Sequence, residues 1–232
     1  MSAEPAEHAI RSAASDTIGV GLGLFPIGMA FGLLVTQSGL EWWWAPLFST
    51  LVYAGSMEFL LIGLVTALTS LPSIAATTFL VNSRHLFYGL SFPLHRVHGR
   101  AQRAYSVYAL TDEAYALTAN LPDEALTSKR IVWIQIFCQS YWVLGGVVGA
   151  LTGAALPGDI RGLEFALTAL FAVLAVDAIR ATRDIPTPVL ALACALIAMN
   201  VAPGQMLVVA LALFVCGLLV RLRLRRAGVA HA

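Results

Sequence analysis

Charged residues are scarce in this sequence of 232 residues: they make up 12% of it, whereas hydrophobic residues make up 59%. A typical soluble domain is about 25% charged and about 45–50% apolar. A soluble protein of this size could not bury so much apolar surface. The formal net charge of +1 also provides no bulk attraction for an acidic partner. The composition excludes disorder, a coiled coil and a nucleic-acid-binding module, and predicts a polytopic membrane protein.

Signatures of several other protein classes are also missing. No histidine spacing matches a zinc-binding helix, and no Walker A pattern indicates ATP hydrolysis by this chain. The first 16 residues lack the basic and apolar regions of a cleaved signal, so we expect the first hydrophobic stretch to remain in the mature protein. The cysteines lie unpaired in apolar runs and predict buried helix residues: Cys138, Cys194 and Cys216. We expect no cofactor, no metal and no enzymatic activity.

Long apolar stretches dominate the chain. A helix needs about 20 apolar residues to cross the hydrocarbon core, and the candidate stretches are 17–40, 42–69, 73–92, 104–121, 131–157, 163–179 and 185–220. The last is too long for one crossing, and Pro203-Gly204 divides it into a hairpin of two helices. We predict an all-α polytopic membrane bundle of about seven spans. Its parts are a polar N-terminal segment (1–16), a single transmembrane domain (17–222) and a basic cytoplasmic tail (223–232).

Arginine-rich segments indicate the orientation, because basic loops face the cytoplasm. They occupy the loop 96–103, the turn 180–183 and the tail from Arg221. All three fall on one side only if 104–121 does not cross, so we predict that 104–121 is re-entrant or lines a cavity from the cytoplasmic side. Three crossings before it place the N-terminus outside. The alternative keeps the N-terminus inside and makes an early segment re-entrant, with the break at Gly55.

An internal symmetry is also visible. A glycine-rich stretch, a stretch with one acid and a third apolar stretch begin at 17, 42 and 73, and again at 131, 163 and 185. The acids are Glu58 and Asp177. Inverted repeats with interrupted helices that meet at mid-membrane are a transporter design, so inverted repeats are possible here. Asp177 lies within a turn of Arg180, which favours a structural pair.

Charges inside the apolar stretches are costly, at about 2.5–3.5 kcal/mol each on insertion scales. Glu58 follows Gly55 and Ser56, where a broken helix could free backbone groups for a substrate; packing against a neighbouring helix is the other interpretation. Arg84 always carries its charge and needs a carboxylate, carbonyls or an anionic ligand. His85 beside it titrates near neutrality and could relay protons.

Asp112 and Glu113 sit together in the middle of 104–121. Adjacent residues on a helix point about 100° apart, so we expect them to differ in role: one pairs inward and the other faces water or ligand. Either of them, or Glu58, could neutralise Arg84. A substrate carboxylate could do so instead.

Four motifs occur in this order: residues 25–32 (FPIGMAFG), 53–59 (YAGSMEF), 81–89 (VNSRHLFYG) and 110–115 (LTDEAY). Together they resemble the AzlC family, the large subunit of bacterial branched-chain amino acid exporters, over about residues 12–222. Glu58 departs from the pattern, since members commonly carry glutamine there. The resemblance implies export of leucine, isoleucine, valine or similar amino acids across the inner membrane, together with a small AzlD-like membrane partner.

We therefore expect a secondary transporter subunit that exports a neutral, apolar amino acid. The candidate substrate-binding residues are Gly55, Ser56, Glu58, Asn82, Arg84, His85, Asp112 and Glu113. The proton-coupling candidates are Glu58, His85, Asp112 and Glu113. One alternative is a permease subunit driven by a separate ATPase. Another is a membrane enzyme that uses His85, His95, His98, Asp112 and Glu113.

Overall fold

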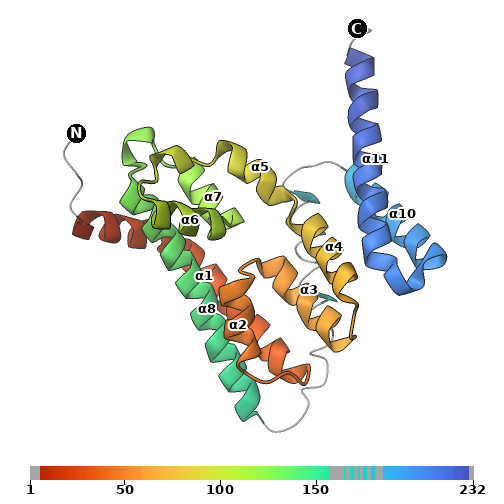
Figure 1. Cartoon of the computed structure of the whole chain (residues 1–232), viewed down its shortest axis with the longest axis horizontal. Coiled ribbons are helices and arrows are strands. Elements are labelled where there is room, and N and C mark those ends of the chain that lie inside the picture. The colour runs from red at the N-terminus through yellow and green to blue at the C-terminus, as the bar shows by residue number, and fades with distance from the viewer. Residues whose placement is uncertain are drawn as a thin grey trace. The chain divides into compact units, whose positions relative to one another are not determined.

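The computed structural model describes residues 6–156, 165, 168–169, 172, 175–176, 179–180 and 185–229. Its secondary structure is helical, which confirms the predicted all-α class (Figure 1). The chain forms two compact units, Met1–Thr66 with Asn82–Ile160, and Ala67–Val81 with Arg161–Ala232. The helices of the first unit are α1 (Ala6–Gln37), α2 (Trp44–Leu51), α3 (Gly55–Thr66), α5 (Arg84–Ser91), α6 (Arg100–Tyr108), α7 (Asp112–Ala119) and α8 (Ser128–Ala155).

The second unit contains most of α4 (Leu71–Asn82) and a helical hairpin. Its hairpin helices are α10 (Pro186–Val201) and α11 (Met206–Val229), joined by a single 3-10 turn over Pro203–Gln205. The predicted division at Pro203 is therefore confirmed. Arg221 of α11 donates to Thr187 Oγ1 of α10 at 2.6 Å. The predicted stretch 163–179, including Asp177, lies largely outside the described residues.

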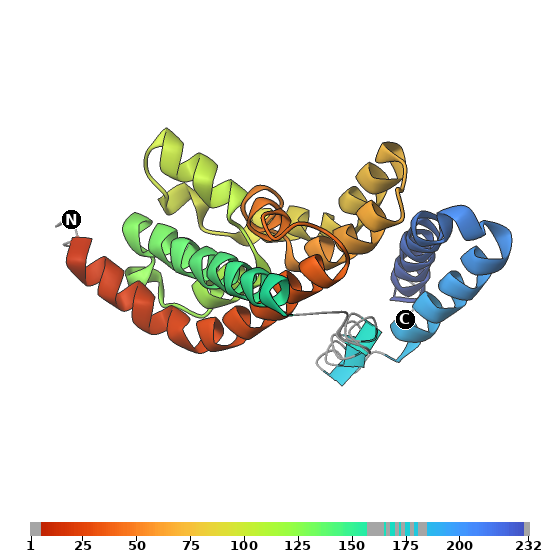
Figure 2. The ribbon, with the colours of Figure 1, turned by 90° about the horizontal axis from the view of Figure 1, so that it is seen from below.

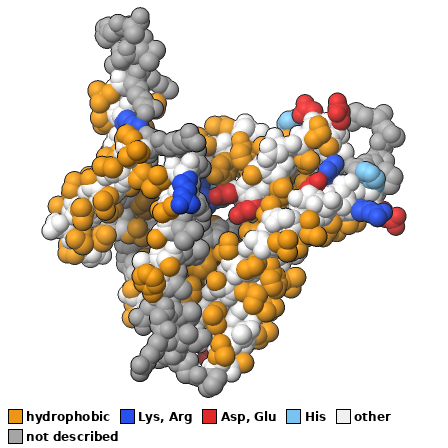
Figure 3. Space-filling view, turned by 180° about the vertical axis from the view of Figure 1, so that it is seen from behind, with side chains coloured by type: hydrophobic (Ala, Val, Ile, Leu, Met, Phe, Trp, Pro, Cys, Tyr) orange, Lys and Arg blue, Asp and Glu red, His pale blue; other side chains and the backbone are white. Residues whose placement is uncertain are grey.

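Three helices in the described part of the chain are long and apolar enough to cross a membrane: Glu7–Gln37, Ser128–Ala155 and Pro203–Leu224. Large apolar side chains stay exposed on them; Leu22, for example, is 76% exposed. In Figure 3, hydrophobic side chains are spread widely over the described helices, and charged side chains gather at a few places. Such a surface suits contact with lipid rather than with water. α1 begins at Ala6 and α11 continues to Val229, so helices run across both predicted domain boundaries.

α1 and α8 form the core of the first unit by packing directly backbone to backbone. A Cβ built on Gly28 would lie 2.7 Å from the carbonyl oxygen of Trp142. One built on Gly32 or on Gly149 would collide with the backbone of the opposite helix. Only glycine permits this approach, which is the usual basis of tight packing between membrane helices. α1 curves along its length (Figure 2) but is not interrupted at Pro26.

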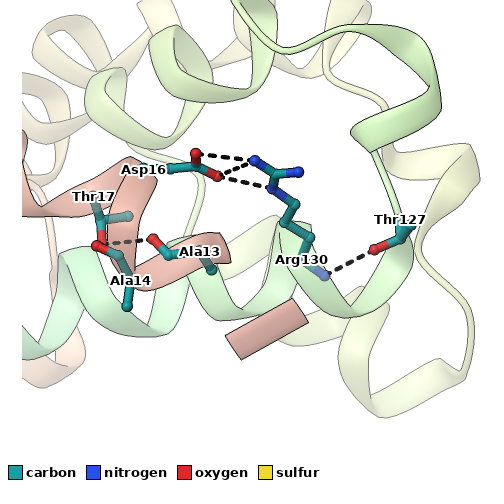
Figure 4. Close-up of polar contacts among 6 residues, drawn as sticks. All are labelled: Ala13, Ala14, Asp16, Thr17, Thr127 and Arg130. Atoms are coloured by element: carbon teal, nitrogen blue, oxygen red, sulfur yellow. Dashed lines mark hydrogen bonds and ion pairs between the residues drawn. The ribbon is translucent and has the colours of Figure 1, made fainter. Parts of the chain in front are cut away.

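α1 and α8 run in the same direction. Near their starts, Asp16 pairs with Arg130 (Figure 4), and near their ends Gln37 Nε2 donates to the carbonyl oxygen of Gly153 at 3.5 Å. The starts of both helices therefore face the same side. This favours the topology with the N-terminus inside over the one with it outside. It also shows that these two glycine-rich helices are not related as an inverted pair, because such a pair would run in opposite directions.

α6 and α7 form a hairpin, and both of its ends lie beside the start of α8. On the way in, the backbone N–H of His98 donates to Ser128 Oγ at 2.9 Å. At the tip, Gln135 Nε2 donates to the carbonyl oxygens of Ser106 and Ala109 at 2.9 and 3.1 Å. On the way out, Asp123 pairs with Arg96 of the basic loop. Helices of 9 and 8 residues are too short to cross, so 104–121 has the hairpin shape that a re-entrant or cavity-lining segment needs.

α2 and α3 form a second hairpin, which enters from the opposite end of α8. α2 starts after the end of α1, and its Ser49 lies beside Gly146 of α8. The chain then bends at residues 52–54, and Gly55 lies against the ring of Trp142. In Figure 1, α3 turns back toward the end at which α2 began. The expected break before Glu58 is thus confirmed, and the two hairpins approach each other from opposite ends.

The predicted stretch 73–92 is also interrupted, which the sequence did not indicate. α4 ends at Asn82 and α5 begins at Arg84. No glycine or proline lies at this junction, and these are the usual residues at breaks in membrane helices. The junction sets Arg84 in the first turn of a new helix.

Candidate functional site

The breaks between helices place polar groups inside the first unit, and the α2–α3 bend lies at mid-depth. Trp142, which faces the α2–α3 bend, lies fourteen residues after the start of α8 at Ser128 and thirteen before its end at Ala155. At about 1.5 Å per residue, this places it about 20 Å from either end of the helix. The hairpin tips and the α4–α5 junction contribute all eight residues predicted for the site.

Arg84 pairs with Asp112 across two of these breaks. Arg84 Nη1 lies 2.5 Å from Asp112 Oδ2, and the two side chains are 40% and 37% exposed. Asp112 opens α7, whose first turn is capped by Thr111, the Oγ1 of which accepts the N–H of Ala114 at 3.4 Å. Of the three acids considered for Arg84, the structure pairs it with Asp112. Charges joined in this way are held in place, yet both remain accessible to a ligand.

Two polar atoms beside this pair have no hydrogen-bond partner in the described part of the chain. They are Arg84 Nε, a donor, and Asn82 Oδ1, an acceptor, and both atoms are buried. His85 Nδ1 lies 3.0 Å from the backbone oxygen of Asn82, which holds the ring close to the α4–α5 junction. A buried donor and a buried acceptor without partners are unfavourable, and their position suits a small ligand that carries both kinds of group.

An aromatic wall flanks the ion pair. The rings of Tyr88 and Tyr115 stack with their centroids 4.8 Å apart, and His85 meets Tyr88 edge to face at 5.7 Å. Glu113 lies close enough to Tyr88 and Tyr53 to interact with them electrostatically. Unlike Asp112, Glu113 forms no ion pair within the described residues. The two adjacent acids therefore differ in pairing, and that they also differ in role stays a prediction.

Glu58 lies apart from this ion pair, in a sealed pocket. Its side chain is fully buried. Oε1 accepts the N–H of Ala54 at 2.9 Å, Oε2 accepts the hydroxyl of Ser49 at 3.1 Å, and the indole N–H of Trp142 lies 3.1 and 3.0 Å from the two oxygens. Gly55 and half-buried Ser56 precede Glu58 in the first turn of α3. In this conformation Glu58 has no free oxygen to offer a substrate.

The tips of the two hairpins touch. The hydroxyl of Tyr108 at the end of α6 donates to the carbonyl oxygen of Thr50 in α2, and the rings of Tyr53 and Tyr108 lie 5.9 Å apart. Gln139 of α8 donates to the same tyrosine hydroxyl at 2.9 Å. Tyr53 has a φ of 43°, a left-handed conformation that is strained for a residue with a Cβ. The α2–α3 bend is thus held in place by the opposite hairpin.

Sequence reasoning missed several residues that complete these contacts: Ser49, Tyr108, Gln135, Gln139 and Trp142. One signal was available. Gln135 and Gln139 are four residues apart in an otherwise apolar run, so they share one face of α8, and that face meets the hairpin tips. No group of His, Cys, Asp and Glu in the described segments could hold a metal ion.

Comparison with known proteins identifies the family. The family model described as AzlC protein matches residues 19–156. The chain belongs to the AzlC family. The matched region spans both hairpins, α5 and α8, so it contains all eight predicted site residues. Asp16 lies outside the matched region, although its partner Arg130 lies inside it.

Relatives of this AzlC chain are membrane proteins. It is 35% identical to an uncharacterized membrane protein of Helicobacter pylori, over 76% of this chain and 78% of that one. It is 30% identical to the branched-chain amino acid transport protein AzlC of Bacillus subtilis, over 73% and 67%. It is also 30% identical to inner membrane protein YgaZ of Escherichia coli, over 72% of each. No solved structure matches. The chain is therefore a multi-pass membrane protein with a role in transport.

Proposed function

We propose that this chain is a secondary transporter subunit that exports branched-chain or similar neutral, apolar amino acids across the inner membrane. The observation that carries the proposal is the Arg84–Asp112 pair, 2.5 Å long and half-exposed at the meeting point of interrupted helices. An α-amino acid is a zwitterion, so it needs a cation for its carboxylate and acceptors for its ammonium group. This site holds one group of each kind.

A zwitterion can replace the ion pair without changing the net charge of the site. Its carboxylate would accept charge-assisted hydrogen bonds from Arg84, including one from the Nε that has no partner in the described chain. Its ammonium group would donate hydrogen bonds to Asp112 and to the unpartnered Oδ1 of Asn82. A cationic or anionic amino acid would leave an extra charge in an apolar surrounding, which is costly. The site therefore favours neutral amino acids.

Apolar side chains around the site account for selection of the substrate side chain. Tyr88 and Tyr115 present stacked ring faces next to the ion pair. One methylene group more or less in an apolar pocket changes binding by only about 1–3 kcal/mol. Such a pocket accepts leucine, isoleucine and valine together and rejects polar side chains more strongly. The name of the Bacillus subtilis relative, a branched-chain amino acid transport protein, supports this substrate class.

A small AzlD-like membrane subunit is part of the proposal. The glycine-rich faces of α1 and α8 largely pack against each other. Gly19 and Gly23, however, have no atom of the described chain within 4 Å of a Cβ built on them. They are four residues apart and lie beside exposed Ile18 and Leu22. Small residues at this spacing permit close approach of another helix, which supports a partner there.

The test is export from bacterial cells loaded with dipeptides of leucine, isoleucine, valine, lysine or glutamate. Cells that produce this chain with its small partner should release the three branched-chain amino acids faster than cells with an empty vector. Lysine and glutamate release should not change. Faster lysine or glutamate release, or unchanged leucine release, would contradict the proposal. Export that stops on ATP depletion while the proton gradient persists would favour the ATPase-driven alternative.

A further inference from the structure

Glu58 and the Arg84–Asp112 pair occupy different surroundings, although the sequence placed them in one site. Arg84 and Asp112 are half-exposed, whereas Glu58 is fully buried. The two oxygens of Glu58 already accept from three donors: Ala54 N–H at Oε1, the Ser49 hydroxyl at Oε2, and the Trp142 N–H, which the two oxygens share. A substrate ammonium would have to displace these donors. Glu58 therefore needs a role that a sealed carboxyl group can perform.

The groups that face Glu58 are all neutral. α2 contributes the hydroxyl of Ser49, and α8 contributes the indole N–H of Trp142. α6 contributes the Tyr108 hydroxyl, which lies within electrostatic range. From α1, the ring of Phe31 covers the site by stacking on Trp142 at 5.9 Å. Within the described residues, no Lys, Arg or His forms an ion pair with Glu58.

A carboxylate at mid-depth of a membrane protein without a cation is unfavourable, because burial removes its hydration. The neutral carboxylic acid fits the same contacts. Its O–H can donate to Ser49 Oγ, 3.1 Å from Oε2, while its other oxygen accepts from Ala54 and Trp142. This reverses the bond seen in the structure, in which Ser49 donates to Oε2, so that the Ser49 hydroxyl accepts from the carboxylic acid instead. The sealed pocket thus stabilises the protonated form.

We propose that Glu58 is the proton-binding site of this transporter, and that a proton carried on its carboxyl group is the ion exchanged for the exported amino acid. The inference rests on the proposed function. The step is a proton transfer only. An O–H bond forms at Glu58 when the α2–α3 hairpin opens the carboxylate to water on one side. The same bond breaks when Glu58 reaches water on the other side, which regenerates the carboxylate.

The position of Glu58 next to the α2–α3 bend makes this proton transfer possible. Glu58 lies in the first turn of α3, directly after the bend at residues 52–54. That bend contains the strained Tyr53 and is held by Tyr108 of the opposite hairpin. A strained segment held by a contact from another element can adopt a second arrangement when that contact is lost. Rotation of this bend would move Glu58 out of its pocket without unfolding either α1 or α8.

The experiment uses proteoliposomes that contain the full chain and its small partner, without ATP. Two quantities are measured: leucine counterflow, which needs no proton coupling, and leucine accumulation driven by a pH gradient. Glu58→Gln keeps the size and the neutral state of the side chain, and its amide can donate to Ser49 and accept from Trp142. We expect Glu58→Gln to retain counterflow and to lose gradient-driven accumulation to the level of empty liposomes. Its counterflow should not vary with pH between 5 and 8.

Matched variants separate coupling from packing. Ser49→Ala and Trp142→Phe remove hydrogen bonds from the same pocket but leave the carboxyl group, so both should keep gradient-driven accumulation with a shifted pH profile. Glu58→Asp keeps a titratable group and should keep accumulation with a shifted pH profile, which provides a result if Glu58→Gln does not fold. Gradient-driven accumulation by Glu58→Gln, or its loss in both Glu58→Asp and Ser49→Ala, would overturn the inference. Absence of counterflow in the unmodified protein would instead overturn the proposed function.

Discussion

Arg84 and Arg130 each pair with an aspartate on another helix, yet the two pairs differ in what they leave free. The side chains of Arg130 and Asp16 are 16% and 19% exposed. They share two hydrogen bonds, from Nε at 2.8 Å and from Nη2 at 3.0 Å (Figure 4). Arg84 and Asp112 are about twice as exposed, and Arg84 Nε has no partner in the described chain. The Arg130–Asp16 pair fixes α1 against α8, whereas the Arg84–Asp112 pair can still bind a ligand.

Gln135 allows a test at the scale of one residue. Its amide holds the carbonyl oxygens of Ser106 and Ala109 at the tip of the α6–α7 hairpin, and its side chain is fully buried. Gln135→Met keeps the size but leaves two buried carbonyl groups without a donor. This should lower the free energy of unfolding by about 1–3 kcal/mol. Gln102→Met, at an exposed bond to Ser128, should change it by less than about 0.5 kcal/mol. Thermal unfolding in detergent measures both, and equal effects would contradict this role of Gln135.

At this scale the sequence identified the charges but not their neutral partners. Arg84 and Asp112 stand out because a charge in an apolar stretch needs a partner, and the acids available were few. Trp142 is 84 residues away from Glu58, and nothing in an apolar run distinguishes an indole that packs from one that donates. Ser49 is equally unremarkable in sequence. Such contacts depend on how the hairpins return to α8, which local patterns do not encode.

Among the elements, the short helices contribute most of the candidate site, because their ends lie inside the first unit. α2, α5, α6 and α7 have eight or nine residues each, less than half of what a crossing needs. Their ends leave backbone groups that other elements must satisfy. The sequence indicated the breaks at Gly55 and Pro203 through glycine and proline, and the short hairpin at 104–121 through the distribution of arginine-rich segments. It did not indicate the break at Ser83, where neither signal is present.

The packing of α1 on α8 leads to a prediction for this pair of elements. A Cβ on Gly149 would collide with the backbone of Met29, whereas a Cβ on Gly19 meets no atom of the described chain within 4 Å. Gly149→Ala should therefore force the helices apart and sharply reduce the yield of folded protein. Gly19→Ala should leave the yield of this chain alone unchanged. Size-exclusion chromatography of detergent extracts measures the folded fraction. Equal yields for the two variants would show that the helices do not pack this closely.

At the scale of the whole molecule, orientation combines the arginine pattern with the parallel packing of α1 and α8. The arginine pattern places the basic loop 96–103 inside. Since α1 and α8 run in the same direction, the loop after α1 lies at the opposite end from the start of α8. The sequence left two topologies open because hydropathy cannot distinguish a crossing stretch from a re-entrant hairpin of the same length. Contacts along α8 make that distinction.

Cysteine labelling tests this orientation. In a background without Cys138, Cys194 and Cys216, a cysteine at Glu41 should react with an impermeant thiol reagent in intact cells. Cysteines at His98 and Gly228 should react only after the membrane is permeabilised. Glu41 and His98 are exposed in the structure, so a lack of reaction reflects the membrane and not burial. Reaction of His98→Cys or Gly228→Cys in intact cells would contradict the topology.

The most direct test of the transport site is leucine export by two doubly neutralised variants. In Arg84→Met with Asp112→Leu, both charges leave together, so the protein should insert and express normally; export should nevertheless fall to the background of the empty vector, because the groups that bind the zwitterion are gone. In the matched control, Asp16→Leu with Arg130→Met, the structural pair leaves and export should continue. Export at the unmodified rate by the Arg84/Asp112 variant would place that pair in the scaffold and contradict the account.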